Sequence, residues 1–280
     1  MADVSGSPWN ENAPSERQVR HAAFLAGVIR LAQEFETAYR PRRTATPADR
    51  ELLHLVAYGL LIRSVEVCEG MRLLRESPVQ SALLRILAEA FVNLQFIECE
   101  PGKRADRARN FHDFWDVNRL KFLREVGRRF PGLLEQASTS DADLKAKLDP
   151  HRDRFCHKRG DGSEYWDWER LDLVSRVEAA AKALGTDVSD PERHTRIVAL
   201  YQETNPYVHS GFRSLMASLV PGTGVEAMRP RVVAQDEPIN ASLIASALLL
   251  DLLAVCTRVF DCSDFDARIE ALSKECIAAQ

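Results

Sequence analysis

The chain has 280 residues, of which 45% are hydrophobic and 28% are charged, so it holds enough apolar side chains for the core of a globular protein. Its formal net charge of −4 excludes a polycation that coats nucleic acid over its whole surface. Between residues 101 and 160, however, fifteen Lys and Arg stand against nine Asp and Glu. These basic residues could hold a phosphate-bearing partner. The plainer alternative is that they only form solvated helix faces.

Helix signals dominate the first hundred residues. We expect residues 1–14 to be disordered and a capping box of Ser15 and Gln18 to start a helix that ends near Tyr39. Thr46-Pro47 predicts the start of a second helix, up to about residue 75, and Ser77-Pro78 the start of a third, up to about residue 98.

The remainder continues as helices separated by short Gly- and Pro-containing turns, which are too short to divide independent domains. The expected elements are a charged helix at 105–129, an irregular stretch at 138–168 with two short helical pieces, helices at 169–185, 190–206 and 209–219, a loop at 221–238 and two C-terminal helices. The sequence therefore predicts an all-α multi-helix bundle with a single domain at 15–280.

Two features bear on the cellular location. Six cysteines are scattered without a Cys-x-x-Cys pair, and residues 1–17 have no apolar stretch of the kind a secretory signal needs. They predict free thiols and a cytoplasmic protein.

Residues 239–260 are apolar, but Asn240, Asp251 and Arg258 interrupt a run that falls short of the ~20 residues of a membrane span. We therefore expect a buried core helix there and no membrane partner.

The first candidate site consists of Arg85, Glu89 and Asn93, which four-residue spacing places on one face of the third helix. Arg63 and Glu66 on the preceding helix have similar spacing. These residues could form one buried charged network that holds a ligand. The plainer interpretation is that the ion pairs fix the register of the helices.

The second candidate lies at residues 149–157, where Arg152 and His157 have the spacing Arg-x4-His. If this segment is helical, both side chains could approach one phosphate, with histidine as the base for a 2′-hydroxyl and arginine balancing the phosphorane charge. A metal site of His151, Cys156 and His157 is a weaker interpretation, because the spacing matches no common zinc pattern. A basic surface loop is the alternative without chemistry.

The third candidate is His209, with Asn205 and Tyr201 four and eight residues upstream. An exposed histidine at a helix junction can transfer protons near neutral pH, although a lone histidine usually has a structural role. Residues 165–168, which include two tryptophans, could stack on a base or anchor a loop.

These segments resemble the bacterial family called domain of unknown function 5677, over roughly residues 52–219. The resemblance is carried by five segments, residues 62–66, 84–93, 104–114, 176–185 and 201–211.

A wider resemblance is to HEPN domains, which are helical bundles that include metal-independent ribonucleases of toxin and antiphage systems. Their Arg-x4-6-His signature is matched by Arg152 and His157, whereas the segment that ends at His209 has Thr204 where the arginine belongs. This departure leaves Arg85 or Arg63 as replacements, or a catalytically silent domain.

The resemblance implies a HEPN-like core with additional helices, a homodimer, and binding of RNA or a nucleotide with metal-independent cleavage in bacterial defence. No cofactor motif is present, and we expect no cofactor and no metal. In this hypothesis, the proton is transferred by His209 or His157, and the phosphate is held by Arg85, Arg152 or Arg63. The arginines are oriented by Glu89 and Glu66. The substrate is contacted by Asn93, Tyr201 and Asn205.

Two other functions stay open. The first is a non-catalytic interaction module, in which the charged pairs fix the bundle and the basic residues between 101 and 160 bind a partner protein. The second is a metal-dependent hydrolase, which requires converging Glu and His ligands.

Overall fold

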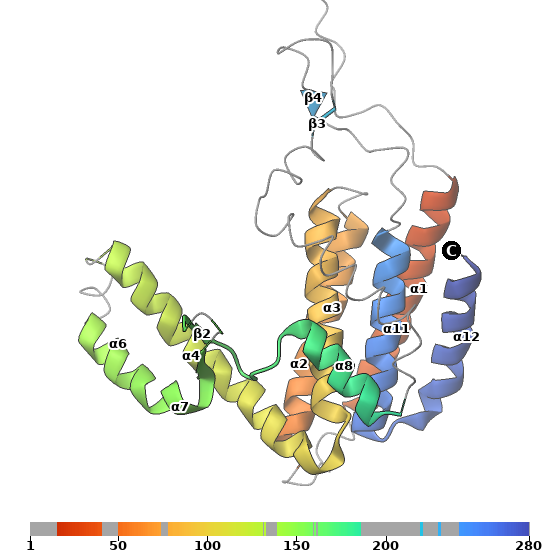
Figure 1. Cartoon of the computed structure of the whole chain (residues 1–280). Helices are drawn as coiled ribbons and strands as arrows, with labels where there is room; N and C mark the ends of the chain where they lie inside the picture. The colour runs from red at the N-terminus through yellow and green to blue at the C-terminus, as the bar shows by residue number, and fades with distance from the viewer. Residues whose placement is uncertain are drawn as a thin grey trace, which may run out of the picture.

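The fold is described from a computed structural model, which covers residues 16–40, 50–73, 78–130, 132, 139–158, 160, 162–185, 219–220, 229–230 and 241–279. These residues are mostly helical, and the helices pack together, so the predicted all-α bundle is confirmed (Figure 1).

Five of the described helices form the bundle. They are α1 (Glu16–Tyr39), α2 (Glu51–Leu73), α3 (Pro78–Glu98), α11 (Ala241–Phe260) and α12 (Asp266–Ala278). Helix α11 packs against each of the other four (Figure 1). The observed starts and ends of α1 and α3 agree with the predicted ones to within a residue.

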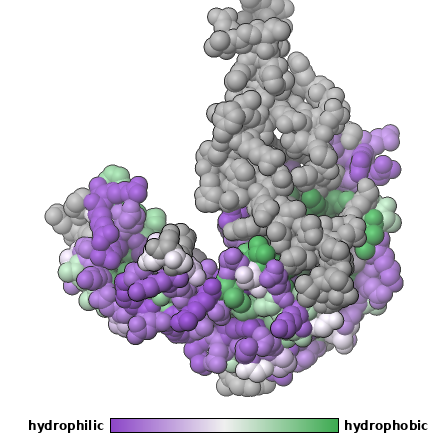
Figure 2. All heavy atoms as spheres, in the orientation of Figure 1, coloured by the Kyte–Doolittle hydropathy of each residue, from purple (hydrophilic) through white to green (hydrophobic). Residues whose placement is uncertain are grey.

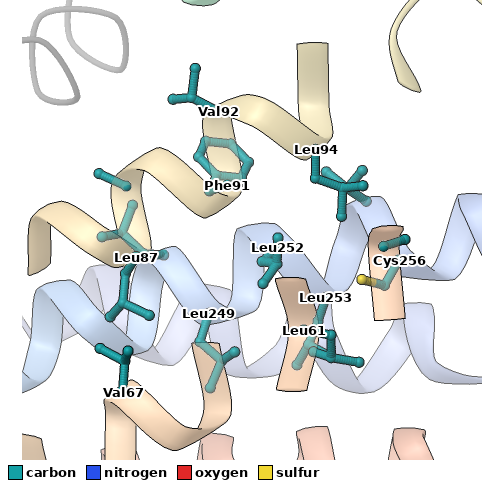
Figure 3. Close-up of a cluster of buried hydrophobic side chains, with 14 of the residues drawn as sticks. Leu61, Val67, Leu87, Phe91, Val92, Leu94, Leu249, Leu252, Leu253 and Cys256 are labelled. Atoms are coloured by element: carbon teal, nitrogen blue, oxygen red, sulfur yellow. The ribbon is translucent and has the colours of Figure 1, made fainter. Parts of the chain in front are cut away.

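Helix α11 is the core helix of the bundle. Among the described residues it is the one helix long and apolar enough to cross a membrane by length and composition. Fifteen of its side chains are buried inside the protein. Leu249, Leu252 and Leu253 lie among apolar side chains of α2 and α3, such as Leu61 and Leu87 (Figure 3). The prediction of a buried core helix in this segment is confirmed.

Helix α4 (Arg104–Arg129) leaves the bundle and carries a smaller group of elements (Figure 1). It contacts α2 and α3 within the bundle, and α6 packs against its far part. We call the described residues from 112 to 166 the arm. The elements that follow α4 are α6 (Asp141–Leu148), a 3-10 turn η3 (Asp149–His151), α7 (Arg152–Phe155), strands β1 (Cys156–Lys158) and β2 (Glu164–Trp166), and α8 (Leu173–Ala183), which packs on α3.

The strands β1 and β2 were not predicted. The sequence indicated an irregular stretch at 138–168 with two short helical pieces. α6 and α7 match these pieces, but a β-hairpin follows them. Each strand has three residues, too few for an alternating apolar pattern to be recognised. Gly162, with φ 81°, adopts the left-handed conformation in the connection between the strands. A second pair of short strands consists of β3 (Leu219–Val220) and β4 (Arg229–Pro230). β4 lies within the loop expected at 221–238, and β3 begins at Leu219, where a helix was expected to end.

Helix α8 begins later than predicted and ends where predicted. Its start at Leu173 rather than near Glu169 follows from Asp172, whose carboxylate accepts a hydrogen bond from the backbone N–H of Ser175. Gly185, with φ 63°, ends the helix as a left-handed C′ residue. The disordered segment predicted at 1–14 and the helices predicted at 190–206 and 209–219 lie outside the described residues, apart from Leu219.

All six cysteines are free, as predicted from their scattered positions. Five are buried, and burial raises the pKa of Cys68 to about 12. These thiols therefore act as small apolar side chains at neutral pH.

His54 is buried at the junction of α1, α2 and α11. Its Nδ1 lies 3.0 Å from the hydroxyl of Tyr39, and its ring packs edge-on against Phe260. Burial lowers the pKa of His54 and Arg50 adds to this, while Asp261 and a backbone hydrogen bond at Val259 act in the opposite direction.

We predict that the free energy of unfolding falls as the pH drops below about 6.5, because the unfolded chain takes up a proton at His54 that the folded chain resists. Urea unfolding at pH 7.5 and 5.5 measures this, and His54→Gln should show a smaller fall than wild type. Equal falls in the two proteins would refute the assignment to His54.

Candidate functional site

The hairpin of β1 and β2 has two faces with different chemistry. Residues directly opposite each other in an antiparallel pair project to the same face, and neighbours along a strand project to opposite faces. Lys158 pairs with Glu164 and Cys156 with Trp166, so these four share one face. His157 pairs with Tyr165 on the other face. The hairpin therefore separates His157 from the charged side chains that surround it in sequence.

The first face carries a cluster of cations around one carboxylate. Arg152, from α7, donates to both carboxylate oxygens of Glu164. Lys158 is exposed beside this pair, and the Nζ of Lys121 from α4 lies 5.7 Å from the centre of the Trp166 ring. We call Lys121, Arg152, Lys158, Glu164 and Cys156 the hairpin cluster. These five residues include three cations and one carboxylate. Asp149 near Arg152 and Asp167 near Lys121 add more distant negative charges.

Electrostatics in the hairpin cluster favour charged arginine and carboxylate and a protonated thiol. The hydrogen bond from Arg152 lowers the pKa of Glu164, and the same bond raises the pKa of Arg152. Burial, supported by Glu164, raises the pKa of the Cys156 thiol. Since the thiolate is the nucleophilic form, Cys156 is not an activated nucleophile in this arrangement.

Arg152 and His157 do not form one site, although the sequence gives them the spacing of a catalytic pair. Their joint approach to a phosphate requires a helix through both, but the backbone leaves the helix at Cys156, with φ −98° and ψ 114°. His157 is 7% exposed, and its Nε2 lies 3.2 Å from the carbonyl oxygen of Asp167. Arg152 bonds to Glu164 on the opposite face of the hairpin.

On the side of His157, a row of polar side chains joins α3 to α8. Arg85 donates to Glu89 with an Nε–Oε1 distance of 2.9 Å, and Asn93 follows one turn later on the same face of α3. The Nη1 of Arg176, on α8, donates to Asn93 Oδ1 over 2.9 Å, and its Nη2 donates to Asp167 Oδ1 over 2.7 Å. We call Arg85, Glu89, Asn93, Arg176 and Asp167 the polar seam.

Arg176 is the centre of the polar seam, although no sequence motif gives it a role. It is 5% exposed, and its guanidinium carbon lies 4.6 Å from the centre of the Trp168 ring. Its Nε is buried without a hydrogen-bond partner among the described residues. The only sequence signal was a position on the apolar side of an amphipathic helix, where an arginine usually has a buried partner.

The charges of the polar seam are balanced. Two arginines stand against Glu89 and Asp167, so the seam offers no net positive charge to a phosphate. The arrangement fits the structural alternative, in which ion pairs and hydrogen bonds fix the register of α3, α8 and the loop at Asp167.

The pair on α2 stays apart from this network. Arg63 and Glu66 are 3.5 Å apart, and their side chains are 62% and 61% exposed. In Arg85 and Glu89 these fractions are 13% and 40%. The expected single buried network of these four residues is therefore not formed, because Arg63 and Glu66 lie on the solvent side of α2.

Three of the predicted site residues, Tyr201, Asn205 and His209, lie outside the described residues. Within the part of the chain that the structure describes, no three His, Cys, Asp or Glu side chains converge in a way that could hold a metal ion, His151, Cys156 and His157 included. Trp168 is buried against Phe96 and Phe111, so the interpretation of the tryptophan segment as a loop anchor holds for this residue.

Comparison with known proteins places most of this region in one family. Residues 54–224, which include most of α2 and all of α3, the arm and α8, match the model described as a family of unknown function, DUF5677. The comparison with curated proteins found no match, and neither did the comparison with solved structures. The wider resemblance to HEPN domains gains no support from these findings. The chain belongs to the DUF5677 family.

Proposed function

We propose that the chain is a helical protein that binds RNA or a nucleotide through the hairpin cluster. Lys121, Arg152 and Lys158 gather on one face of the hairpin, where Glu164 is the carboxylate bonded to Arg152, and this arrangement supports the proposal. The visible surface of the arm is mostly hydrophilic, as a site for a polar ligand requires (Figure 2). All of these residues lie within the segment that defines the family.

Glu164 prepares Arg152 for a phosphate. A guanidinium held by a carboxylate keeps a fixed orientation, so less side-chain entropy is lost when a second anion binds it. The Arg152 side chain is 48% exposed, which leaves it open to a ligand. Lys158 and Lys121 supply the charge that remains after Glu164 is balanced, and phosphate binding to such groups releases counterions.

Cleavage of RNA is a second step that the hairpin cluster does not provide by itself. Metal-independent cleavage needs a proton acceptor beside the phosphate. His157 lies on the opposite face, bonded to a backbone carbonyl oxygen. The ribonuclease hypothesis, with its HEPN-like arrangement and its setting in cytoplasmic bacterial defence, therefore depends on His209 as the proton-transfer residue. The non-catalytic module remains the alternative, and the polar seam, which is balanced in charge, favours it.

Removal of a cation from the hairpin cluster should weaken RNA binding. We expect Arg152→Ala to raise the Kd for a labelled single-stranded RNA about tenfold, because a charge-assisted hydrogen bond is lost and Glu164 is left uncompensated. Lys158→Ala should raise it by a smaller factor. Fluorescence anisotropy at a fixed salt concentration measures both values.

Arg63→Ala provides the matched control, because Arg63 is an exposed arginine paired with a carboxylate on another surface. Its Kd should equal that of wild type; an equal loss in Arg63→Ala and Arg152→Ala would contradict the assignment to the hairpin cluster. The same samples incubated in EDTA report on cleavage. Cleavage by wild type and not by His209→Ala would support the ribonuclease hypothesis, and binding without cleavage would support the non-catalytic module.

A further inference from the structure

The far half of α4 has one covered face and one open face. Phe114 and Val117 are buried, and Arg124 is bonded to Asp141 of α6 with an Nε–Oδ1 distance of 2.8 Å. Each residue turns the helix by ~100°, so Phe114, Val117 and Arg124 share the side toward α6. Lys121 falls on this side too, over Trp166. The hairpin cluster and α6 therefore occupy the same side of α4.

The opposite side exposes large aromatic side chains. Trp115 is 73% exposed and Phe122 is 67% exposed. With ~100° per residue, Arg119, Val126 and Arg129 lie on the same side, and the five positions follow the alternating spacing of four and three residues. We call Trp115, Arg119, Phe122, Val126 and Arg129 the α4 stripe. Exposed aromatics at heptad spacing are typical of a helix that packs against another helix.

The α4 stripe and its acidic neighbour Glu125 are self-complementary about Phe122. If two α4 helices cross antiparallel with Phe122 facing Phe122, the residue three positions before the centre meets the residue three positions after it. Arg119 then faces Glu125 of the second copy, and this pair occurs twice. The residues seven positions away also meet, so Trp115 faces Arg129 of the second copy, which is a favourable cation–aromatic pair. A parallel pairing would bring each charge against its own copy and is disfavoured.

We propose that the protein forms a twofold symmetric dimer through the α4 stripe, with two antiparallel α4 helices crossing at Phe122. Glu125 already accepts a hydrogen bond from Arg129 of its own helix, at 2.9 Å, through Oε1. Its carboxylate can therefore hold Arg129 in place for stacking while its other oxygen accepts from Arg119 of the second copy. The charge complementarity of this face is with itself, and this favours a second copy over an RNA strand as its occupant.

The dimer is independent of the proposed RNA binding. The hairpin cluster lies toward α6, so both clusters of the dimer stay open to a ligand. A single pair of crossing helices is a small interface, and we expect a Kd in the micromolar range.

Sedimentation equilibrium of the full chain up to about 100 µM tests the dimer. Arg119→Glu should weaken it at least tenfold, because the substituted residue then meets Glu125 of the second copy. Glu125→Arg should do the same. The double substitution Arg119→Glu/Glu125→Arg should restore dimerisation above the level of Glu125→Arg, since opposite charges face each other again with their signs exchanged. Both variants that carry arginine at 125 lose the pair with Arg129, so their comparison isolates the contact between copies.

Phe122→Asp should give a monomer, with Leu73→Asp as a control at an exposed leucine on α2. Circular dichroism melting checks that each variant is folded. A wild type that stays monomeric at 100 µM, or a double variant no better than Glu125→Arg, would overturn the proposal. A monomeric wild type whose RNA affinity falls in Phe122→Ala would assign the α4 stripe to nucleic acid instead. Loss of RNA binding in Arg152→Ala with an intact dimer would leave the two proposals separate.

Discussion

Arg176→Ala should lower the free energy of unfolding by about 3 kcal/mol, which is the cost of removing one partner from a buried ion pair. The substitution leaves Asp167 without its cation and Asn93 Oδ1 without its donor, and it removes the guanidinium that covers Trp168. The effect belongs at the lower end of the range for buried pairs because the Asp167 side chain is 32% exposed and water can solvate it. Chemical denaturation of the two proteins measures the difference.

A double-mutant cycle with Asp167→Asn tests the reason for this loss. In the wild type, the backbone N–H of Trp168 donates to Asp167 Oδ1 over 2.7 Å. The amide oxygen of asparagine can accept the same hydrogen bond, but the substitution removes the negative charge. The loss in the double variant should therefore be smaller than the sum of the two single losses. Arg63→Ala, which breaks an exposed pair, should cost less than about 0.5 kcal/mol. A loss below about 1 kcal/mol in Arg176→Ala would contradict the structural role of the polar seam.

Leu253→Ala should destabilise the bundle by about 3 to 5 kcal/mol, through the lost burial of its methyl groups and the cavity that they leave. Leu253 is fully buried on α11, among the side chains of Figure 3. Because α11 packs against four helices, none of them can move into the cavity without leaving its other contacts. Urea unfolding followed by circular dichroism measures the effect.

Leu73→Ala is the matched control, since Leu73 on α2 is 73% exposed. It should change the free energy of unfolding by less than about 0.5 kcal/mol. Equal small losses in the two variants would mean that α11 is not the core of the folded protein.

The helices could be predicted from the sequence because their signals are local. Pro78 marks the start of α3, Gly185 the end of α8, and the apolar spacing from Leu84 to Leu94 the buried side of α3. The apolar segment near the C-terminus could be assigned to the core because charged and polar residues interrupt it. Each of these signals comes from residues within a few turns of one another.

The site could be predicted only in part, because its contacts join residues that are far apart in the chain. Asn93 and Glu89 were named from their spacing, but the partner of Asn93, Arg176, lies 83 residues away. Arg152 and His157 match a motif, but no sequence pattern indicates the three-residue strands β1 and β2. These strands place His157 on one face of the hairpin and Glu164, the partner of Arg152, on the other. The exposure of Trp115 and Phe122 was equally hidden, since aromatics at helical spacing usually belong to a core.

The salt dependence of RNA binding tests whether the hairpin cluster is a phosphate site. The Kd for a labelled single-stranded RNA is measured for wild type, Arg152→Ala and Arg63→Ala between about 50 and 200 mM salt. If the cluster is such a site, the logarithm of the association constant falls linearly with the logarithm of the salt concentration for wild type. The slope should be smaller by about 0.7 for Arg152→Ala, which loses one phosphate contact, while Arg63→Ala should keep the slope of wild type. A wild type without measurable binding at the lowest salt, or the same slope in all three proteins, would contradict it.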